Sequence, residues 1–189
     1  MANTVKANDV EVYEHDIYIY ADEYIATLDD VKDLKNIHTF AGMIKHISLK
    51  INITKKQLED IVLLNHIWQI YTSLCYKYSQ NITIERYCIL INISRETYYS
   101  WIKGVTRDEY NEVLNVSRSD VCKKWAAECE SSWQDAAGIG NPGAMFVLKA
   151  RHGWQETATQ EVIHTHRIEK SAEQIAQDYD IPLIETTTI

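Results

Sequence analysis

The sequence predicts an all-α fold, and three observations support that prediction. The 189 residues include only six glycines and two prolines, fewer than a turn-rich β-protein requires. Apolar residues recur at alternating steps of three and four, the spacing of one helix face. Ser, Thr and Asn precede these segments and glycines follow them. We expect an N-terminal helix-turn-helix domain followed by a helical oligomerisation hairpin, with a short C-terminal strand as an option.

Residues 1–50 are expected to form an N-terminal arm and a short helix. Tyrosines and acids are mixed near the start, and the alternation from Ile17 to Tyr20 fits a short strand as well as an arm. The spacing of apolar residues predicts a short helix from Thr39 to Ile47.

A long helix is predicted from Lys55 to Tyr78, with Thr54 as its N-cap.

Residues 51–110 carry the most informative pattern, two short helices joined by a tight turn. The first helix is predicted from Ile84 to Ile91, behind Thr83 as N-cap. Ser94 caps the second helix, and Gly104 ends it. Such a pair can present one face of the second helix to the major groove, so the pattern indicates a DNA-binding domain.

The second of these helices divides into two faces at about 100° per residue. Tyr98, Trp101, Ile102 and Val105 form the face expected to be buried. Cations on the other face could contact phosphates or guanine edges, and its hydroxyls could donate to phosphates. Glu96 could accept from a cytosine amino group, or simply favour the helix start. The predicted DNA-binding residues are Arg95, Glu96, Thr97, Tyr99, Ser100, Lys103 and Arg107.

The net charge of −8 argues against strong binding to nucleic acid. The charge is unevenly distributed, however. Between Thr54 and Arg107 there are seven basic and four acidic residues, which makes that segment mildly basic. We therefore expect phosphate contacts that are local, modest and sensitive to salt.

Residues 111–155 are predicted to form two oligomerisation helices, and residues 156–189 a C-terminal segment. The first helix is expected from Asp120 to Ala137, and Asn141-Pro142 opens a second one that stops at Gly153. In the C-terminal segment, Glu161 to His166 fit an inter-subunit strand, and Ile168 to Tyr179 fit a helix before a docking tail. An aromatic stripe at helical spacing indicates either a core or a subunit contact. The predicted interface residues are Trp125, Cys129, Trp133, Phe146 and Leu148.

No pattern of an enzyme is present, so no cofactor is expected. The sequence lacks a phosphate-binding GxxxxGK[ST] loop. His164 and His166 lack a third committed ligand, so we expect no metal site. The four cysteines form no CxxC pair and lie in apolar helical patterns, as buried free thiols do. No signal region or membrane-length apolar run is found, which favours a soluble protein of a reducing cytoplasm.

Two runs resemble the small terminase subunits of tailed bacteriophages. One is NISRETYYSWIKG, and the other runs from Cys122 to Glu156, where a long helix, a Gly-Asn-Pro turn and a Leu-Lys-x-x-x-Gly-Trp ending follow one another. Together the runs lie within Ile82 to Glu156. The first 50 residues carry no such resemblance.

The resemblance implies a role in DNA packaging inside the host cytoplasm. Proteins of this family bind packaging-site double-stranded DNA as homo-oligomeric rings of about eight to ten subunits. They regulate the ATPase and nuclease of the large terminase subunit. Ring assembly would offset weak electrostatics by multivalency. Two alternatives stay open: a dimeric helix-turn-helix transcription regulator, and a helical adaptor that binds no DNA.

Overall fold

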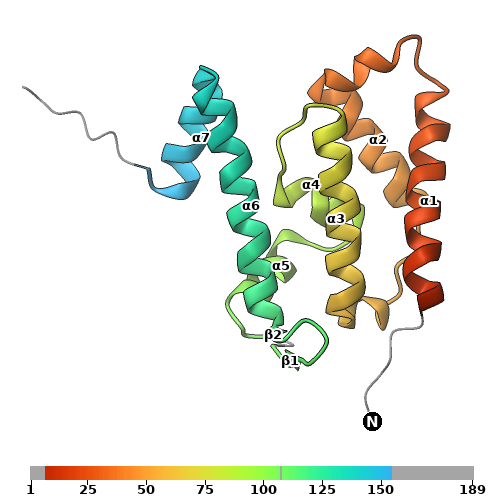
Figure 1. The fold of residues 1–189 in the computed structure, drawn as a ribbon, viewed down its shortest axis with the longest axis vertical. Helices are drawn as coiled ribbons and strands as arrows, with labels where there is room; N and C mark the ends of the chain where they lie inside the picture. Colours follow the sequence, from red (N-terminus) through yellow and green to blue (C-terminus); the bar gives the residue numbers. More distant parts are fainter. Residues whose placement is uncertain (1–6, 107, 155–189) are drawn as a thin grey trace, which may run out of the picture. The chain divides into compact units, whose positions relative to one another are not determined.

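The computed structural model describes residues 7–106 and 108–154, and this part of the chain is mainly helical, as expected. The predicted strand and helix after Glu156 lie outside it. The elements in chain order are α1 (Ala7–Ile25), the 3-10 turn η1 (Val31–Lys35), α2 (Ile37–Lys50), the 3-10 turn η2 (Gln57–Glu59), α3 (Ile61–Lys77), α4 (Ile84–Leu90), α5 (Arg95–Ile102), β1 (Tyr110–Asn111), β2 (Val116–Ser117), α6 (Arg118–Gly138) and α7 (Pro142–His152) (Figure 1).

Helix α1 corrects the prediction of an arm or a short strand near the N-terminus. Tyr13, Ile17 and Ala21 are buried at steps of four, and this stripe packs against α2 and α3. In a strand Ile17 and Ile19 would share a face. Here Ile17 is fully buried, whereas 40% of Ile19 is exposed. The local alternation of apolar and polar residues was therefore misleading, because the longer four-residue spacing controls burial.

Helix α3 is the central helix of the fold, and ten of its 17 residues are buried. It begins at Ile61, later than predicted, because the Asp60 carboxylate accepts hydrogen bonds from the backbone N–H groups of Val62 and Leu63 at 3.0 and 3.1 Å. Thr54 is not its N-cap. The Thr54 hydroxyl instead donates to the Gln57 side chain at 2.8 Å, just before α3.

An aromatic cluster joins α3, α4 and α6 in the core. The rings of Trp68 and Trp125 are stacked, with centroids 5.3 Å apart and planes 20° from parallel. The Tyr87 ring meets both of them nearly edge-on, at 4.9 Å from Trp68 and 5.1 Å from Trp125. The Tyr87 hydroxyl donates to the Leu64 carbonyl at 2.6 Å. Stacked and edge-on pairs are the favourable ring geometries, so this cluster fixes α6 against α3 and α4.

Four helices, α3 to α6, end with the same left-handed turn. The residue in that conformation is Ser79, Asn92, Gly104 or Gly140, with φ between 55° and 86°. In each case two backbone N–H groups bond back to helix carbonyls, for example Gly104 to Trp101 and Val105 to Ser100. The predicted stop at Gly104 is confirmed. Asn92 performs the same task where no glycine is available, because Asn tolerates this conformation.

Helix α6 packs against the main core with its first half and against α7 with its second half (Figure 1). Ser117 caps its start, immediately after the short antiparallel pair β1–β2, in which Tyr110 faces Ser117. Asn141 caps α7, Pro142 occupies its first turn and Gly153 ends it at φ +69°, as predicted. Near the contact between the end of α6 and α7, the buried residues are Ala136 of α6 and Ala144 and Leu148 of α7.

Candidate nucleic-acid interface

The turn between α4 and α5 is short and closed by hydrogen bonds at both ends. The Thr83 side chain accepts from the Arg86 N–H at the start of α4, as predicted. At the end of α4, the N–H of Ile93 bonds back to the Cys88 carbonyl at 3.0 Å. The Ser94 hydroxyl then accepts from the Thr97 N–H at 3.1 Å and caps α5. This geometry sets the direction in which α5 leaves the turn.

One face of α5 is fixed in the protein interior. Tyr98 is buried, and its hydroxyl donates to the Cys122 carbonyl of α6 at 2.8 Å. Trp101 is also buried, with the Arg118 guanidinium 4.8 Å from its ring centroid. Arg118 in turn donates to the carbonyls of Leu58 and Glu59. The helix is therefore held in one orientation by α6 and by the segment before α3.

The opposite face of α5 is open to solvent. Arg95, Glu96, Tyr99 and Lys103 are exposed, and Thr97 and Ser100 are half-buried. The predicted burial of Val105 is wrong, since 74% of it is exposed beyond the left-handed turn at Gly104. Arg107 lies outside the described residues. The described members of the predicted DNA-binding set therefore form one arc around α5.

Some polar groups of this arc already have partners within α5. The Ser100 hydroxyl donates to the Thr97 carbonyl at 2.7 Å, and the hydroxyls of Thr97 and Ser94 lie 3.1 Å apart. Hydrogen bonds from its own backbone N–H and from the Ser94 hydroxyl lower the pKa of the Glu96 carboxyl. Glu96 thus completes the helix start, its simpler expected role. Arg95, Tyr99 and Lys103 are the side chains best placed to reach a ligand.

Arg95 and Tyr99 form a pair on the exposed arc. The Arg95 guanidinium lies 5.2 Å from the Tyr99 ring centroid, and its Nη2 donates to the Tyr99 hydroxyl at 3.3 Å. The hydrogen bond to Tyr99 is the largest cause raising the pKa of Arg95, so its positive charge is secure. A planar cation next to a hydroxyl suits a phosphate oxygen.

Arg151 joins this surface from the last turn of α7, and sequence analysis did not identify it. Its Nη1 lies 2.7 Å from the Glu85 carboxylate, and the Arg95 Nε lies 3.8 Å from the same oxygen. The sequence shows Arg151 only as one of several basic residues ending a helix. Its proximity to Glu85, 66 positions away, depends on the hairpin of α6 and α7.

The predicted interface residues are found in different environments. Trp125, Cys129 and Leu148 are buried in this chain's own interior, with exposures of 1%, 5% and 0%. Their side chains cannot be the contact surface for a partner while the chain keeps this fold. Trp133 is half-buried, and Phe146 is 71% exposed on α7. A subunit contact through this hairpin therefore depends on Phe146 and its neighbours.

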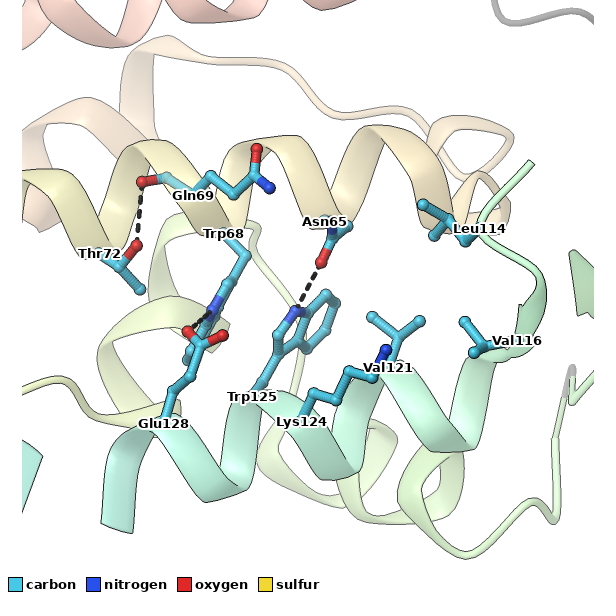
Figure 2. A pocket seen from close by; sticks show the side chains of 10 residues that line it. All are labelled: Asn65, Trp68, Gln69, Thr72, Leu114, Val116, Val121, Lys124, Trp125 and Glu128. Atoms are coloured by element: carbon cyan, nitrogen blue, oxygen red, sulfur yellow. Dashed lines mark hydrogen bonds between the residues drawn. The ribbon is translucent and has the colours of Figure 1, made fainter. Parts of the chain in front are cut away.

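A cleft of about 300 Å³ lies between α3 and α6 (Figure 2). Trp68 and Trp125 point into it and donate through their indole N–H groups, Trp68 to Glu128 at 2.6 Å and Trp125 to Asn65 at 3.1 Å (Figure 2). These rings are only 1% exposed, so they offer no face on which a base could stack. The cleft is a structural seam in which every indole donor has a partner.

The cysteine thiols of the described residues belong to the packed interior, and burial changes their acidity. All four cysteines are free and buried, as predicted. Burial raises the pKa of Cys75 to about 11 and the pKa values of Cys88 and Cys122 to about 12, so these thiols are poor nucleophiles at neutral pH. Within residues 7–106 and 108–154, no group of three or more His, Cys, Asp or Glu side chains could hold a metal ion. His164 and His166 lie outside this part.

Comparisons with known proteins leave the chain's family open. No protein-family model, curated protein or solved structure matches it significantly. Among the helices that the structure describes, none combines the length and the apolar character needed to cross a bilayer.

Proposed function

We propose that this chain is a DNA-binding protein without catalytic activity of its own, acting as the small terminase subunit of a tailed bacteriophage. In this role it binds packaging-site double-stranded DNA as a homo-oligomeric ring and regulates the ATPase and nuclease of the large terminase subunit. The DNA-binding part rests on one observation. Arg95, Tyr99 and Lys103 face solvent on α5, while Tyr98 and Trp101 anchor its other face.

The physical argument for DNA is the combination of a rigid helix and exposed donors. A groove reader needs a helix whose orientation does not change when side chains contact bases or phosphates. Helix α5 is capped by Ser94, closed by Gly104 and bonded to α6 through Tyr98. Its exposed arc supplies two cations and a phenol, which suit phosphate and guanine contacts. The helix pair α4–α5 thus supports a helix-turn-helix role.

The packaging role rests on the resemblance of the two runs within Ile82 to Glu156. The first run spans the turn before α5 and α5 itself, and the second spans most of α6 and all of α7. A ring is consistent with the charge. A chain with net charge −8 and a small basic arc binds DNA weakly alone, and repetition of the arc around a ring multiplies its effect.

Assembly and DNA binding can be tested together on the full chain. Light scattering should give roughly 170–220 kDa for eight to ten 21.9 kDa subunits. A mass of about 44 kDa would favour the dimeric regulator instead. Band-shift titrations should then show binding of packaging-region duplex DNA. Absence of DNA binding in the assembled protein would leave the adaptor alternative.

The α5 arc is tested with Lys103→Ala and Arg95→Ala. Each should weaken binding across all sequences and lower the slope of log affinity against log salt by about one per chain, since each removes one phosphate contact. The matched control is Lys50→Ala on α2, which also removes an exposed, ion-paired cation. If all three variants bind DNA with the affinity of the unmodified protein, α5 is excluded as the DNA-binding surface.

A further inference from the structure

Glu85 brings together two arginines from helices that are far apart in the sequence. Arg95 comes from the first turn of α5, and Arg151 comes from the last turn of α7. Both guanidinium groups lie against the same carboxylate oxygen, Oε1 of Glu85, at 3.8 and 2.7 Å. The result is a surface cluster with two positive charges and one negative charge.

This cluster is accessible and held weakly. The side chains of Arg95 and Arg151 are both 51% exposed, and that of Glu85 is 33% exposed. Ion pairs at such exposure contribute little to stability, because water solvates the separated charges well. Replacing the carboxylate by another anion therefore requires little energy. The folded chain does not depend on Glu85 to keep α5 in place, since Tyr98 and Trp101 do so.

The chemistry of the cluster matches a phosphate group. A guanidinium has five N–H donors arranged in a plane, and it pairs equally well with carboxylates and phosphates. Arg151 donates through Nη1 to Glu85, whereas Arg95 donates through Nη2 to Tyr99 and has its Nε 3.8 Å from Glu85 Oε1, an ion-pair distance. Further N–H groups on both side chains stay available to an incoming anion. Two convergent arginines around one carboxylate oxygen thus form a site of the size and charge of one phosphate.

We propose that Arg95 and Arg151 clamp one phosphate of the nucleic-acid backbone, and that Glu85 occupies this clamp when no nucleic acid is bound. The clamp extends the contact surface from α5 to α7, so the hairpin takes part in binding. This inference rests on the proposed DNA binding by α5. It concerns a sequence-independent contact, because phosphates carry no direct sequence information.

Two substitutions, measured by fluorescence anisotropy on a random-sequence duplex over a series of salt concentrations, test the clamp. Arg151→Ala should weaken binding about tenfold at low salt and lower the salt slope by about one per chain. Glu85→Gln should strengthen binding about threefold, because it removes the competing carboxylate and its repulsion of phosphate while keeping the side-chain shape. Lys50→Ala should leave both quantities unchanged. Circular dichroism should show the same helix content in all variants.

The outcomes separate this inference from the proposed function. If Lys103→Ala weakens binding while Arg151→Ala changes neither affinity nor slope, the clamp is wrong and α5 still binds DNA. If Glu85→Gln weakens binding, Glu85 positions the arginines rather than competing for them, which also overturns the clamp. If the unmodified protein binds no duplex, the proposed function fails and the clamp with it.

Discussion

The two halves of α6 lie in contrasting environments. In the first half, Trp125 stacks on Trp68, and the buried face of the helix packs against α3, α4 and α5. In the second half, α6 contacts the core through Cys129 and the hydrogen bond from the Ile82 N–H to Ser132, and its end packs against α7. The buried residues near α7 are small: Ala136 and Ala144, with Leu148 as the one large side chain. One continuous helix thus connects a large core to a small one.

Because of this difference, we expect the main core to be more stable against local unfolding than the α6–α7 hairpin. Regions with few buried apolar contacts open locally at lower free energy than the core does. The α6–α7 hairpin is such a region, and its remaining ties are surface contacts, including Trp154 Nε1 to Glu130 at 2.9 Å and Arg151 to Glu85. The hairpin is therefore expected to open more readily than α5, which Tyr98 and Trp101 hold in place.

The largest effect is expected from Trp125→Ala. Removing a stacked ring with 1% exposure should lower the free energy of unfolding by about 3–5 kcal/mol, as measured by urea denaturation. Phe146→Ala is the control on the hairpin. With 71% exposure it should change stability by less than about 0.5 kcal/mol. Equal losses in the two variants would contradict the division of α6 into a core half and a peripheral half.

Alkaline pH should destabilise the main core selectively. Burial raises the pKa of Cys122 from 9.0 to about 12, and it also raises the pKa values of Cys75 and Cys88. Unfolded thiols ionise above pH 9 while native ones stay protonated, so the unfolded state binds fewer protons there. Stability is intact below pH 9 and should then fall by about 1 kcal/mol per buried thiol over one pH unit. Thermal unfolding at pH 7 to 11 measures this.

Leu148→Ala should destabilise the hairpin without unfolding the main core. Deleting the one large buried side chain of α7 should weaken its packing by about 2 kcal/mol, at the lower end for such changes because the site is near the surface. Amide hydrogen exchange should speed up in α7 and at the end of α6, and stay unchanged in α3. Faster exchange in α3 as well would mean that both cores unfold as one unit.

The smallest changes in the free energy of unfolding are expected when two glycines are replaced by alanine. Gly104 has φ +66°, and a Cβ there would lie 2.9 Å from the Asp108 carboxylate, so Gly104→Ala should destabilise by about 1 kcal/mol. Gly138, in the last turn of α6, has nothing within 4 Å of an added Cβ. Gly138→Ala should stabilise by about 0.5 kcal/mol. Differential scanning calorimetry resolves the two, and shifts of the same sign would contradict the backbone argument.

Local signals predicted the boundaries of the later helices well. Thr83, Ser94 and Asn141 cap α4, α5 and α7, and Gly104 and Gly153 end α5 and α7. These features were predictable because a cap or a left-handed glycine acts within one turn of the chain. The candidate DNA-binding arc was predictable for the same reason. Once α5 begins at Arg95, the helical period determines which residues share a face.

Local patterns did not decide the positions whose environment depends on a distant segment. Ile17 to Tyr20 alternate like a strand, yet α2 and α3 bury a four-residue stripe of α1. The helical spacing of Trp125 fits a core as well as a subunit contact, and it is the Trp68 ring of α3 that places Trp125 in the core. Arg151 carries no local signal at all.

The sequence by itself determined the helical class, the caps and ends of the later helices and the arc of polar side chains on α5, because each of these depends on residues within a turn or two. The tertiary structure alone decided which apolar stripes became core and which stayed exposed, since burial depends on the partner that arrives from elsewhere in the chain. The same reason explains the pairing of Arg95 and Arg151 around Glu85, in which three charges from three helices meet only after α6 and α7 have folded back.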